Sequence, residues 1–142
     1  MKKIEHIGIA VKNLENSNSL FKKLFGKEHY KIEAVESEAV KTSFFMLGDT
    51  KIELLEASDP GSTIARFIEK RGEGIHHIAY EVSDLEAEML RLKAEGFEFI
   101  HAEPKAGADN KRIVFLHPKS TNGVLVELCQ EKADPKSFQS GA

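Results

Sequence analysis

Two short segments, one near the amino end and one past the middle, carry the same alternation of apolar and polar positions. Residues 6–15 read His-Ile-Gly-Ile-Ala-Val-Lys-Asn-Leu-Glu, and residues 77–86 read His-Ile-Ala-Tyr-Glu-Val-Ser-Asp-Leu-Glu. Period-two alternation predicts a half-buried strand, and the Asn or Asp near the end of each segment is a typical helix cap. The chain therefore contains an internal repeat with an offset of 71 residues, half of its 142.

Each copy of the repeat predicts a strand, a helix and three further strands. Apolar residues at helical spacing follow the cap residues Asn13 and Asp84, and Gly26 and Gly96 end the two helices. A separate stretch, Ser62–Arg71, predicts a short helix that links the copies. The three strands of the first copy are expected at 30–35, 40–47 and 51–55, and those of the second at 97–101, 112–116 and 123–129.

This order of elements predicts an α+β fold of one domain over residues 1–142, in which two βαβββ modules form one cupped mixed sheet around a cleft. Module one covers about 1–60 and module two about 72–132, with the linking helix at about 62–71 and a frayed tail at 133–142. Neither half would bury much apolar surface alone, so the modules are expected to share stability across their junction.

The alternation also predicts which side chains face the cleft, because residues two apart in a strand share a face. In the first strand, the apolar residues at positions 7, 9 and 11 share the face that suits packing under the helix. Ile4 and His6 share the opposite, open face. Ile75 and His77 occupy the equivalent places in the second copy. A small residue, Gly or Ala, follows two positions after each histidine and leaves space beside the imidazole.

One glutamate interrupts the apolar last strand of each copy, Glu53 in the first and Glu127 in the second. A carboxylate in such a strand is costly to bury unless it is paired or metal-bound. Taken singly, a strand histidine is more often a satisfied core or surface residue, and a strand glutamate is more often half-exposed at a sheet edge. Because both types recur at matching places, we predict a divalent metal site formed by His6, Glu53, His77 and Glu127, a ligand set that suits zinc, cobalt, nickel, manganese or iron.

The composition excludes several other classes of protein. Lys plus Arg number 20 and Asp plus Glu number 23, a formal charge of -3 that is too balanced for a partner of nucleic acid or anionic membrane. The single cysteine, Cys129, rules out an internal disulfide and a multi-cysteine metal cage. No signal peptide or membrane-spanning stretch is evident, so a cytoplasmic location is expected.

With these features, the sequence resembles the vicinal oxygen chelate (glyoxalase/bleomycin resistance) superfamily and, within it, the methylmalonyl-CoA epimerases. The resemblance covers nearly the whole chain, from Lys3 to Lys132. Its more specific signatures are a glycine-flanked double histidine and a His-Pro-Lys-Ser turn, and the segments that carry it are 50–56, 72–79, 103–105, 117–120 and 123–128.

The resemblance implies a metal-dependent epimerase that interconverts (R)- and (S)-methylmalonyl-CoA by abstracting the α-proton and stabilising the enolate. It also implies an acyl-CoA substrate, a homodimer and a divalent cobalt, manganese, nickel or zinc ion. The metal positions of the family fall on His6, Glu53, His77 and Glu127, whereas His76 is expected on the opposite face and not as a ligand. Inverting a centre needs two acid–base groups; the resemblance supports Glu127 as one, and its repeat partner Glu53 suits the other.

Two parts of the chain depart from the family pattern. Some of these epimerases carry a further catalytic glutamate in the strand that corresponds to residues 40–45, where this chain has Thr42. The nearest acids, Glu36 and Glu38, precede that strand, which leaves the identity of the second base open. Asp109 and the following Asn stand in a loop where relatives tend to carry glycine.

Two other functions stay open at this point. A lactoylglutathione lyase would use the same metal and glutamates to isomerise a glutathione hemithioacetal. A non-catalytic small-molecule-binding protein of the same fold is less favoured, because such proteins lack the full ligand set. A group of basic residues suits the phosphates of coenzyme A, although a solvated surface is the simpler interpretation: Lys105, Lys111, Arg112 and Lys119.

Overall fold

The computed structural model describes residues 1–132, so the tail expected at 133–142 lies outside the described residues. Module one contains β1 (Lys3–Ala10), α1 (Leu14–Phe25), β2 (Lys31–Val35), a 3-10 turn (Glu36–Glu38), β3 (Val40–Leu47) and β4 (Thr50–Ala57). The linking helix is α2 (Thr63–Arg71). Module two contains β5 (Gly74–Glu81), α3 (Leu85–Ala94), β6 (Lys105–Ala106), β7 (Lys111–Phe115), a 3-10 turn (Pro118–Ser120) and β8 (Val126–Glu131).

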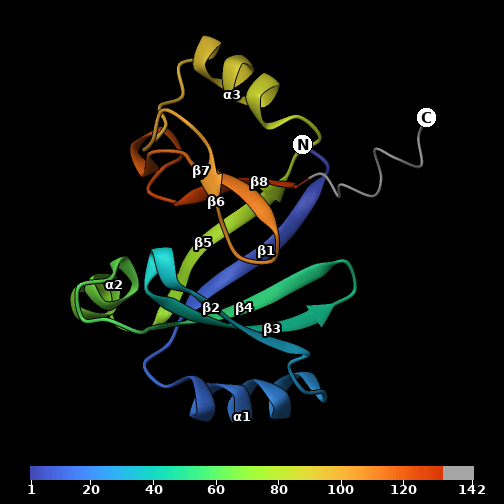
Figure 1. Cartoon of the computed structure of the whole chain (residues 1–142), viewed down its shortest axis with the longest axis vertical. Coiled ribbons are helices and arrows are strands. Elements are labelled where there is room, and N and C mark those ends of the chain that lie inside the picture. The colour runs from blue at the N-terminus through green and yellow to red at the C-terminus, as the bar shows by residue number, and fades with distance from the viewer. Residues whose placement is uncertain (133–142) are drawn as a thin grey trace.

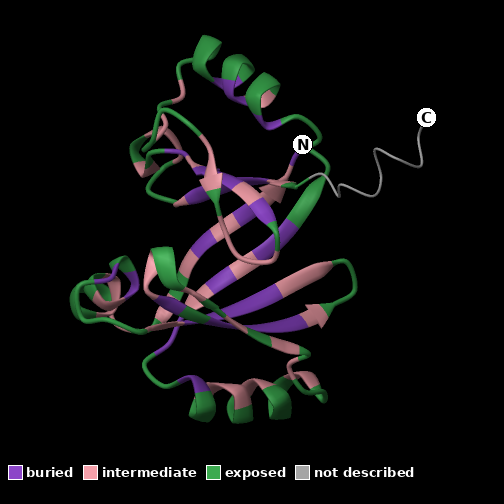
Figure 2. Cartoon of the chain, viewed as in Figure 1, coloured by how far each residue is buried: buried purple, intermediate pink, exposed green. Residues whose placement is uncertain are grey.

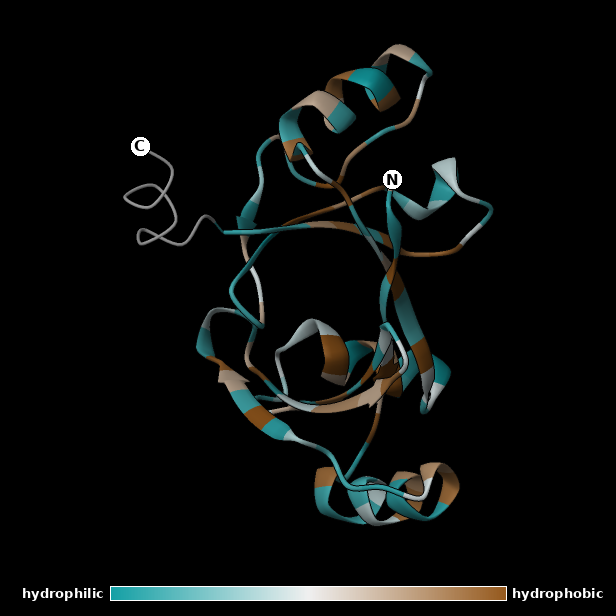
Figure 3. Ribbon diagram, turned by 90° about the vertical axis from the view of Figure 1, so that its right-hand side faces the viewer, coloured by the Kyte–Doolittle hydropathy of each residue, from teal (hydrophilic) through white to brown (hydrophobic). Residues whose placement is uncertain are grey.

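The strands form one mixed eight-stranded sheet in the order β2-β3-β4-β1-β5-β8-β7-β6. Within each module the first strand pairs in parallel with the last, β1 with β4 and β5 with β8. The antiparallel pair β1–β5 joins the two modules, so the same four-strand order runs outward twice from the centre of the sheet. The curled sheet lies between α1 and α3, at opposite ends of the molecule (Figures 1 and 3). The predicted α+β fold of duplicated modules is confirmed.

The helices begin and end where the sequence predicted. The side chains of Asn13 and Asp84 accept hydrogen bonds from backbone N–H groups three residues later, and Ser62 does the same at the start of α2. Each such cap contributes about 1 kcal/mol. Helix α1 ends at Gly26, whose φ of 74° lies in the left-handed region that glycine adopts without a steric penalty.

The apolar faces of the strands pack against the helices, and buried positions run along the central strands (Figure 2). In β4, Ile52 and Leu54 join the core under α1, and in β8, Val126 and Leu128 join the core under α3. The alternate positions of these strands face away from the helices, which leaves one face of the sheet for the functional site. The two helix-covered clusters include Val11, Leu14 and Phe45 in module one, and Val82, Leu85, Met89, Leu92, Val114 and Leu116 in module two.

The prediction of a strand at 97–101 is wrong. Phe99 forms only an isolated bridge with Leu116, and the edge strand beside β7 is the two-residue β6. The chain between them leaves the sheet edge, and Pro104 has no N–H to donate to a strand ladder. The last strand also begins three residues later than predicted, because Gly123 (φ 86°) closes a turn. Within residues 1–132, none of the helices is long and apolar enough to cross a membrane.

Candidate metal centre

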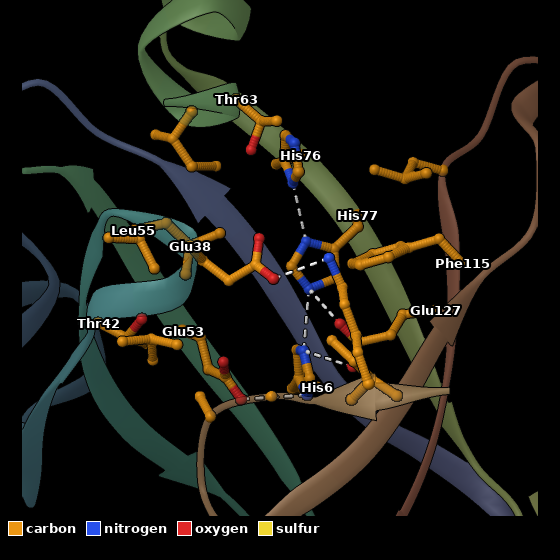
Figure 4. A pocket seen from close by; sticks show the side chains of 18 of the residues that line it. His6, Glu38, Thr42, Glu53, Leu55, Thr63, His76, His77, Phe115 and Glu127 are labelled. Atoms are coloured by element: carbon orange, nitrogen blue, oxygen red, sulfur yellow. Dashed lines mark hydrogen bonds and ion pairs between the residues drawn. The ribbon is translucent and has the colours of Figure 1, made fainter. Parts of the chain in front are cut away.

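The four predicted ligands lie on the four central strands and line one cavity (Figure 4): His6 on β1, Glu53 on β4, His77 on β5 and Glu127 on β8. None of them is more than 5% exposed. Glu53 stands opposite Gly8 in the β1–β4 ladder, and Glu127 stands opposite Ala79 in the β5–β8 ladder. The small residues predicted beside the histidines therefore make room for the two carboxylates as well.

The side chains of His6, His77 and Glu127 converge in one part of the cavity. The Nε2 atoms of His6 and His77 are 2.9 Å apart. The Glu127 carboxylate lies 3.6 Å from the first of these atoms and 3.5 Å from the second. Two ligands about 2.1 Å from an ion lie roughly 3.0 Å apart in octahedral coordination and roughly 3.4 Å apart in tetrahedral coordination, so these separations are in the range of a shared divalent ion.

Glu53 is placed differently. Its Oε2 atom lies 3.0 Å from Nδ1 of His6, on the other side of that ring from His77. Two groups of potential ligands result, one of His6, His77 and Glu127 and the other of Glu5, His6 and Glu53. The structure thus brings all four predicted residues into the cavity but does not gather Glu53 at the same point as the other three.

The charges of the cavity favour a bound cation. Burial raises the pKa of Glu53 to about 7 and that of Glu127 to about 7. Burial alone would lower the pKa of His6, but the charges of Glu53 and Glu127, together with the hydrogen bond and charge of Glu5, outweigh it and raise that pKa to about 9. A divalent ion would supply the positive charge that the buried carboxylates require.

Two residues that strict alternation placed elsewhere also reach the site. His76 was expected on the opposite face, but it lines the cavity, and its Nδ1 lies 2.9 Å from Nδ1 of His77. Glu5, which the sequence analysis missed, is 3% exposed and places Oε1 2.8 Å from Nδ1 of His6. The cause is an irregularity in the β1–β5 ladder at each of these two positions, which breaks the period of two.

Glu38 is a further acid in the cavity. It lies in the 3-10 turn before β3, points into the cavity in Figure 4, and forms a 2.7 Å ion pair with Lys105 of the other module. Lys31 of β2 likewise pairs with Asp109 of the β6–β7 loop at 2.6 Å. These two pairs join opposite edges of the sheet across the cleft. Thr42, which stands where the resemblance implied a further glutamate in some epimerases, is buried in the cavity wall.

The sequence matches a known protein superfamily over most of its length. A match to the Glyoxalase/Bleomycin resistance protein/Dioxygenase superfamily covers residues 5–115. The chain belongs to this superfamily. This agrees with the resemblance inferred from the sequence.

Relatives within the superfamily narrow the comparison. The chain is 44% identical over 127 residues to the mitochondrial methylmalonyl-CoA epimerase of Dictyostelium discoideum, with 89% of this chain and 76% of that protein covered. It is 43% identical over 130 residues to the ethylmalonyl-CoA/methylmalonyl-CoA epimerase of Cereibacter sphaeroides, covering 90% and 97%. The crystal structure of methylmalonyl-CoA epimerase from Mycobacterium tuberculosis has a TM-score of 0.88 at 30% identity, covering 99% of this chain and 92% of that one.

The basic residues near the end of module two, which suited the phosphates of coenzyme A, lie beside carboxylates. Each of the four makes an ion pair with an acidic side chain of the described residues. The pairs are Lys105 with Glu38, Lys111 with Glu131, Arg112 with Glu86 and Lys119 with Glu98. Most of these pairs lie at the surface, which agrees with the simpler interpretation, and only Lys105 lines the cavity.

Gly8 provides a test of the geometry of the site. A Cβ atom at this position would lie 2.3 Å from Cε1 and 2.6 Å from Nδ1 of His77, so the ring would have to move. We expect Gly8→Ala to weaken Co²⁺ binding about ten- to hundredfold, the range seen when metal-ligand orientation is disturbed, as measured by titration calorimetry. Gly61→Ala is the control, because its nearest neighbouring atom is 3.8 Å away. Equal affinity in the two variants would contradict the placement of His77.

Proposed function

We propose that this protein is a metal-dependent epimerase that interconverts (R)- and (S)-methylmalonyl-CoA. The observation that carries the proposal is the convergence of His6, His77 and Glu127 from both modules at one buried point. Support for the substrate comes from the three relatives reported above, which are all named methylmalonyl-CoA epimerases and match about nine-tenths or more of this chain.

The chemistry of the substrate explains why such a site is needed. The hydrogen between a thioester and a carboxylate is only modestly acidic, so its removal requires a base near the carbon and stabilisation of the enolate oxygen. The residues that would hold a divalent ion are His6, Glu53, His77 and Glu127, and the ion would be cobalt, manganese, nickel or zinc. When bound, it supplies a Lewis acid for the thioester and carboxylate oxygens.

Epimerisation also needs two proton-transfer groups on opposite faces of the α-carbon. We assign Glu127 to one face, because its carboxylate lies 3.5 Å from Nε2 of His77 and 3.6 Å from Nε2 of His6, beside the ion that would hold the substrate. The repeat makes Glu53 one candidate for the other face. The structure adds Glu38 as a second candidate, since it enters the cavity from module one and does not contact either candidate ligand histidine within hydrogen-bond distance.

The proposal is tested by exchange of the α-proton with solvent deuterium. Each enantiomer of methylmalonyl-CoA is incubated with the metal-loaded enzyme, and metal content is measured on the same sample. We expect exchange and inversion with both enantiomers. A preparation with full metal content but no exchange would contradict the proposed function.

Two alternative substrates belong in the same assay. Ethylmalonyl-CoA is included because the Cereibacter sphaeroides relative is named as an ethylmalonyl-CoA/methylmalonyl-CoA epimerase. The hemithioacetal of methylglyoxal and glutathione tests the lactoylglutathione lyase alternative, which would use the same ligand set. Turnover of the hemithioacetal alone would favour that alternative, and binding without turnover of any of these compounds would favour a non-catalytic binding protein.

We also propose the assembly and location that the sequence suggested, a cytoplasmic homodimer. The family resemblance supports the dimer, and light scattering on the purified protein tests it. Fractionation of the source cells tests the location.

A further inference from the structure

The ladder between β1 and β5 is irregular at two places, and the two places are equivalent in the repeat. Ile4 pairs with Tyr80 and His6 with Ala79, so Glu5 is an extra residue of β1. Gly8 pairs with His77 and Ile9 with Ile75, so His76 is an extra residue of β5. An inserted residue of this kind redirects a side chain that regular pleating would send to the other face. Each module thus places one additional polar side chain directly before its candidate ligand histidine.

The two redirected side chains make matching contacts. Glu5 Oε1 lies 2.8 Å from Nδ1 of His6, and His76 Nδ1 lies 2.9 Å from Nδ1 of His77. The Nε2 atoms of the same two rings face each other across 2.9 Å (Figure 4). Both candidate ligands therefore present Nε2 to the centre of the cavity and Nδ1 to the residue before them.

We propose that Glu5 and His76 are positioning residues that accept the Nδ1 protons of His6 and His77 and so leave both Nε2 lone pairs free for the metal ion. This inference rests on the metal site of the proposed function. A neutral imidazole carries one proton, and a metal-bound imidazole almost always donates that proton to a neighbouring acceptor that fixes its tautomer and orientation. The two bulges supply these acceptors in both modules.

Glu5 is itself held in place from the opposite side. Its second oxygen, Oε2, lies 2.9 Å from Nζ of Lys51, and the same Nζ is 2.5 Å from Oδ2 of Asp109. The chain of contacts thus runs from His6 through Glu5 and Lys51 to the loop between β6 and β7. Glu53 also approaches Nδ1 of His6, at 3.0 Å, but Glu5 is the nearer acceptor.

His76 is held by packing instead of charge. Its ring meets Phe67 of α2 edge-on, with the ring centroids 5.0 Å apart, and the ring of His77 stands at 90° to it. An apolar neighbour of this kind favours the neutral imidazole, which has one unprotonated nitrogen to accept the proton of His77.

Metal affinity and rescue variants test the proposal. Glu5→Met and His76→Phe keep the approximate shape of each side chain but remove the acceptor, and we expect each to weaken Co²⁺ binding about ten- to hundredfold in titration calorimetry. Glu5→Gln and His76→Gln retain an acceptor oxygen and should recover most of that affinity. Glu15→Met and Ile75→Phe, at exposed positions, are the controls.

A second measurement needs no variant. In the zinc-loaded wild-type protein, imidazole nitrogen NMR should show the proton on Nδ1 of both His6 and His77. A proton on Nε2 of either ring would overturn the proposal, as would acceptor-free variants that bind Co²⁺ like the controls, or amide variants that are as impaired as the acceptor-free ones. A wild-type protein that binds no divalent ion would overturn both this inference and the metal site. One that binds Co²⁺ with the expected tautomers but exchanges no α-proton would overturn the proposed function alone.

Discussion

The Glu127→Gln variant is expected to retain its metal ion, whereas its epimerisation rate should fall about 10² to 10⁴-fold, the usual range for removal of a general base. An amide oxygen can still coordinate an ion, whereas an amide cannot accept the α-proton. The Glu127 carboxylate lies 3.5 Å from Nε2 of His77 and 3.6 Å from Nε2 of His6. It is therefore close enough to the expected ion to reach the α-carbon of a substrate bound to that ion. The rate of deuterium exchange, measured together with metal content, gives both quantities.

A matched control for this experiment is present on the same strand. Glu131 lies at the end of β8 with its side chain 76% exposed, and its ion pair with Lys111 lies outside the cavity. Glu131→Gln removes the same charge without changing the cavity, so its rate should equal that of the wild type. Full activity in Glu127→Gln would contradict the proposed mechanism, and loss of the metal ion from that variant would show that Glu127 serves mainly as a ligand.

The duplication explains why so much of this fold is predictable from the sequence. Because each half repeats the same cap residues and the same alternation, a helix or strand inferred in one copy supports its counterpart in the other. Asn13 and Asp84 cap their helices as expected. Glu53 and Glu127 reach the cavity because their apolar neighbours pack against the helices, and burial of apolar side chains is the strongest determinant of strand facing.

Alternation fails where a strand contains an extra residue. Strict alternation placed Ile4 and Ile75 on the cleft face, but Ile4 is 41% exposed and Ile75 is 62% exposed. The bulges at Glu5 and His76 lie between these isoleucines and the histidines, so residues on the two sides of each bulge no longer share a face. The recurrence of a polar residue directly before each histidine was the only sign of them in the sequence.

The contacts across the cleft also could not be predicted from a sequence pattern. Glu38 and Lys105 are far apart in the chain, and the pair forms only because the curled sheet brings its two edges toward each other. The loop residue Asp109 has a φ of 59°, a left-handed conformation that Asp tolerates better than most residues. Its carboxylate reaches Lys31 and Lys51 of module one, which gives a structural reason for an acidic residue in this loop.

The second base is decided by comparing Glu38→Gln with Glu53→Gln. A residue that serves one face only should, when removed, abolish inversion while one enantiomer still exchanges its α-proton with solvent. We expect this pattern from Glu38→Gln, with epimerisation reduced about 10² to 10⁴-fold and metal content unchanged, because Glu38 lines the cavity outside both groups of potential ligands. Glu53→Gln should instead change metal affinity, because its carboxylate contacts His6.

The control for Glu38 lies in the same 3-10 turn. Glu36 is exposed and does not line the cavity, so Glu36→Gln should behave as the wild type. Thr42→Val should also have little effect, because a hydroxyl with a high pKa is a poor base. If Glu38→Gln epimerises normally and Glu53→Gln shows exchange of one enantiomer only, then Glu53 is the second base, as the repeat predicts. Loss of inversion in both variants with full metal content would mean that two module-one carboxylates share the transfer of the proton opposite Glu127.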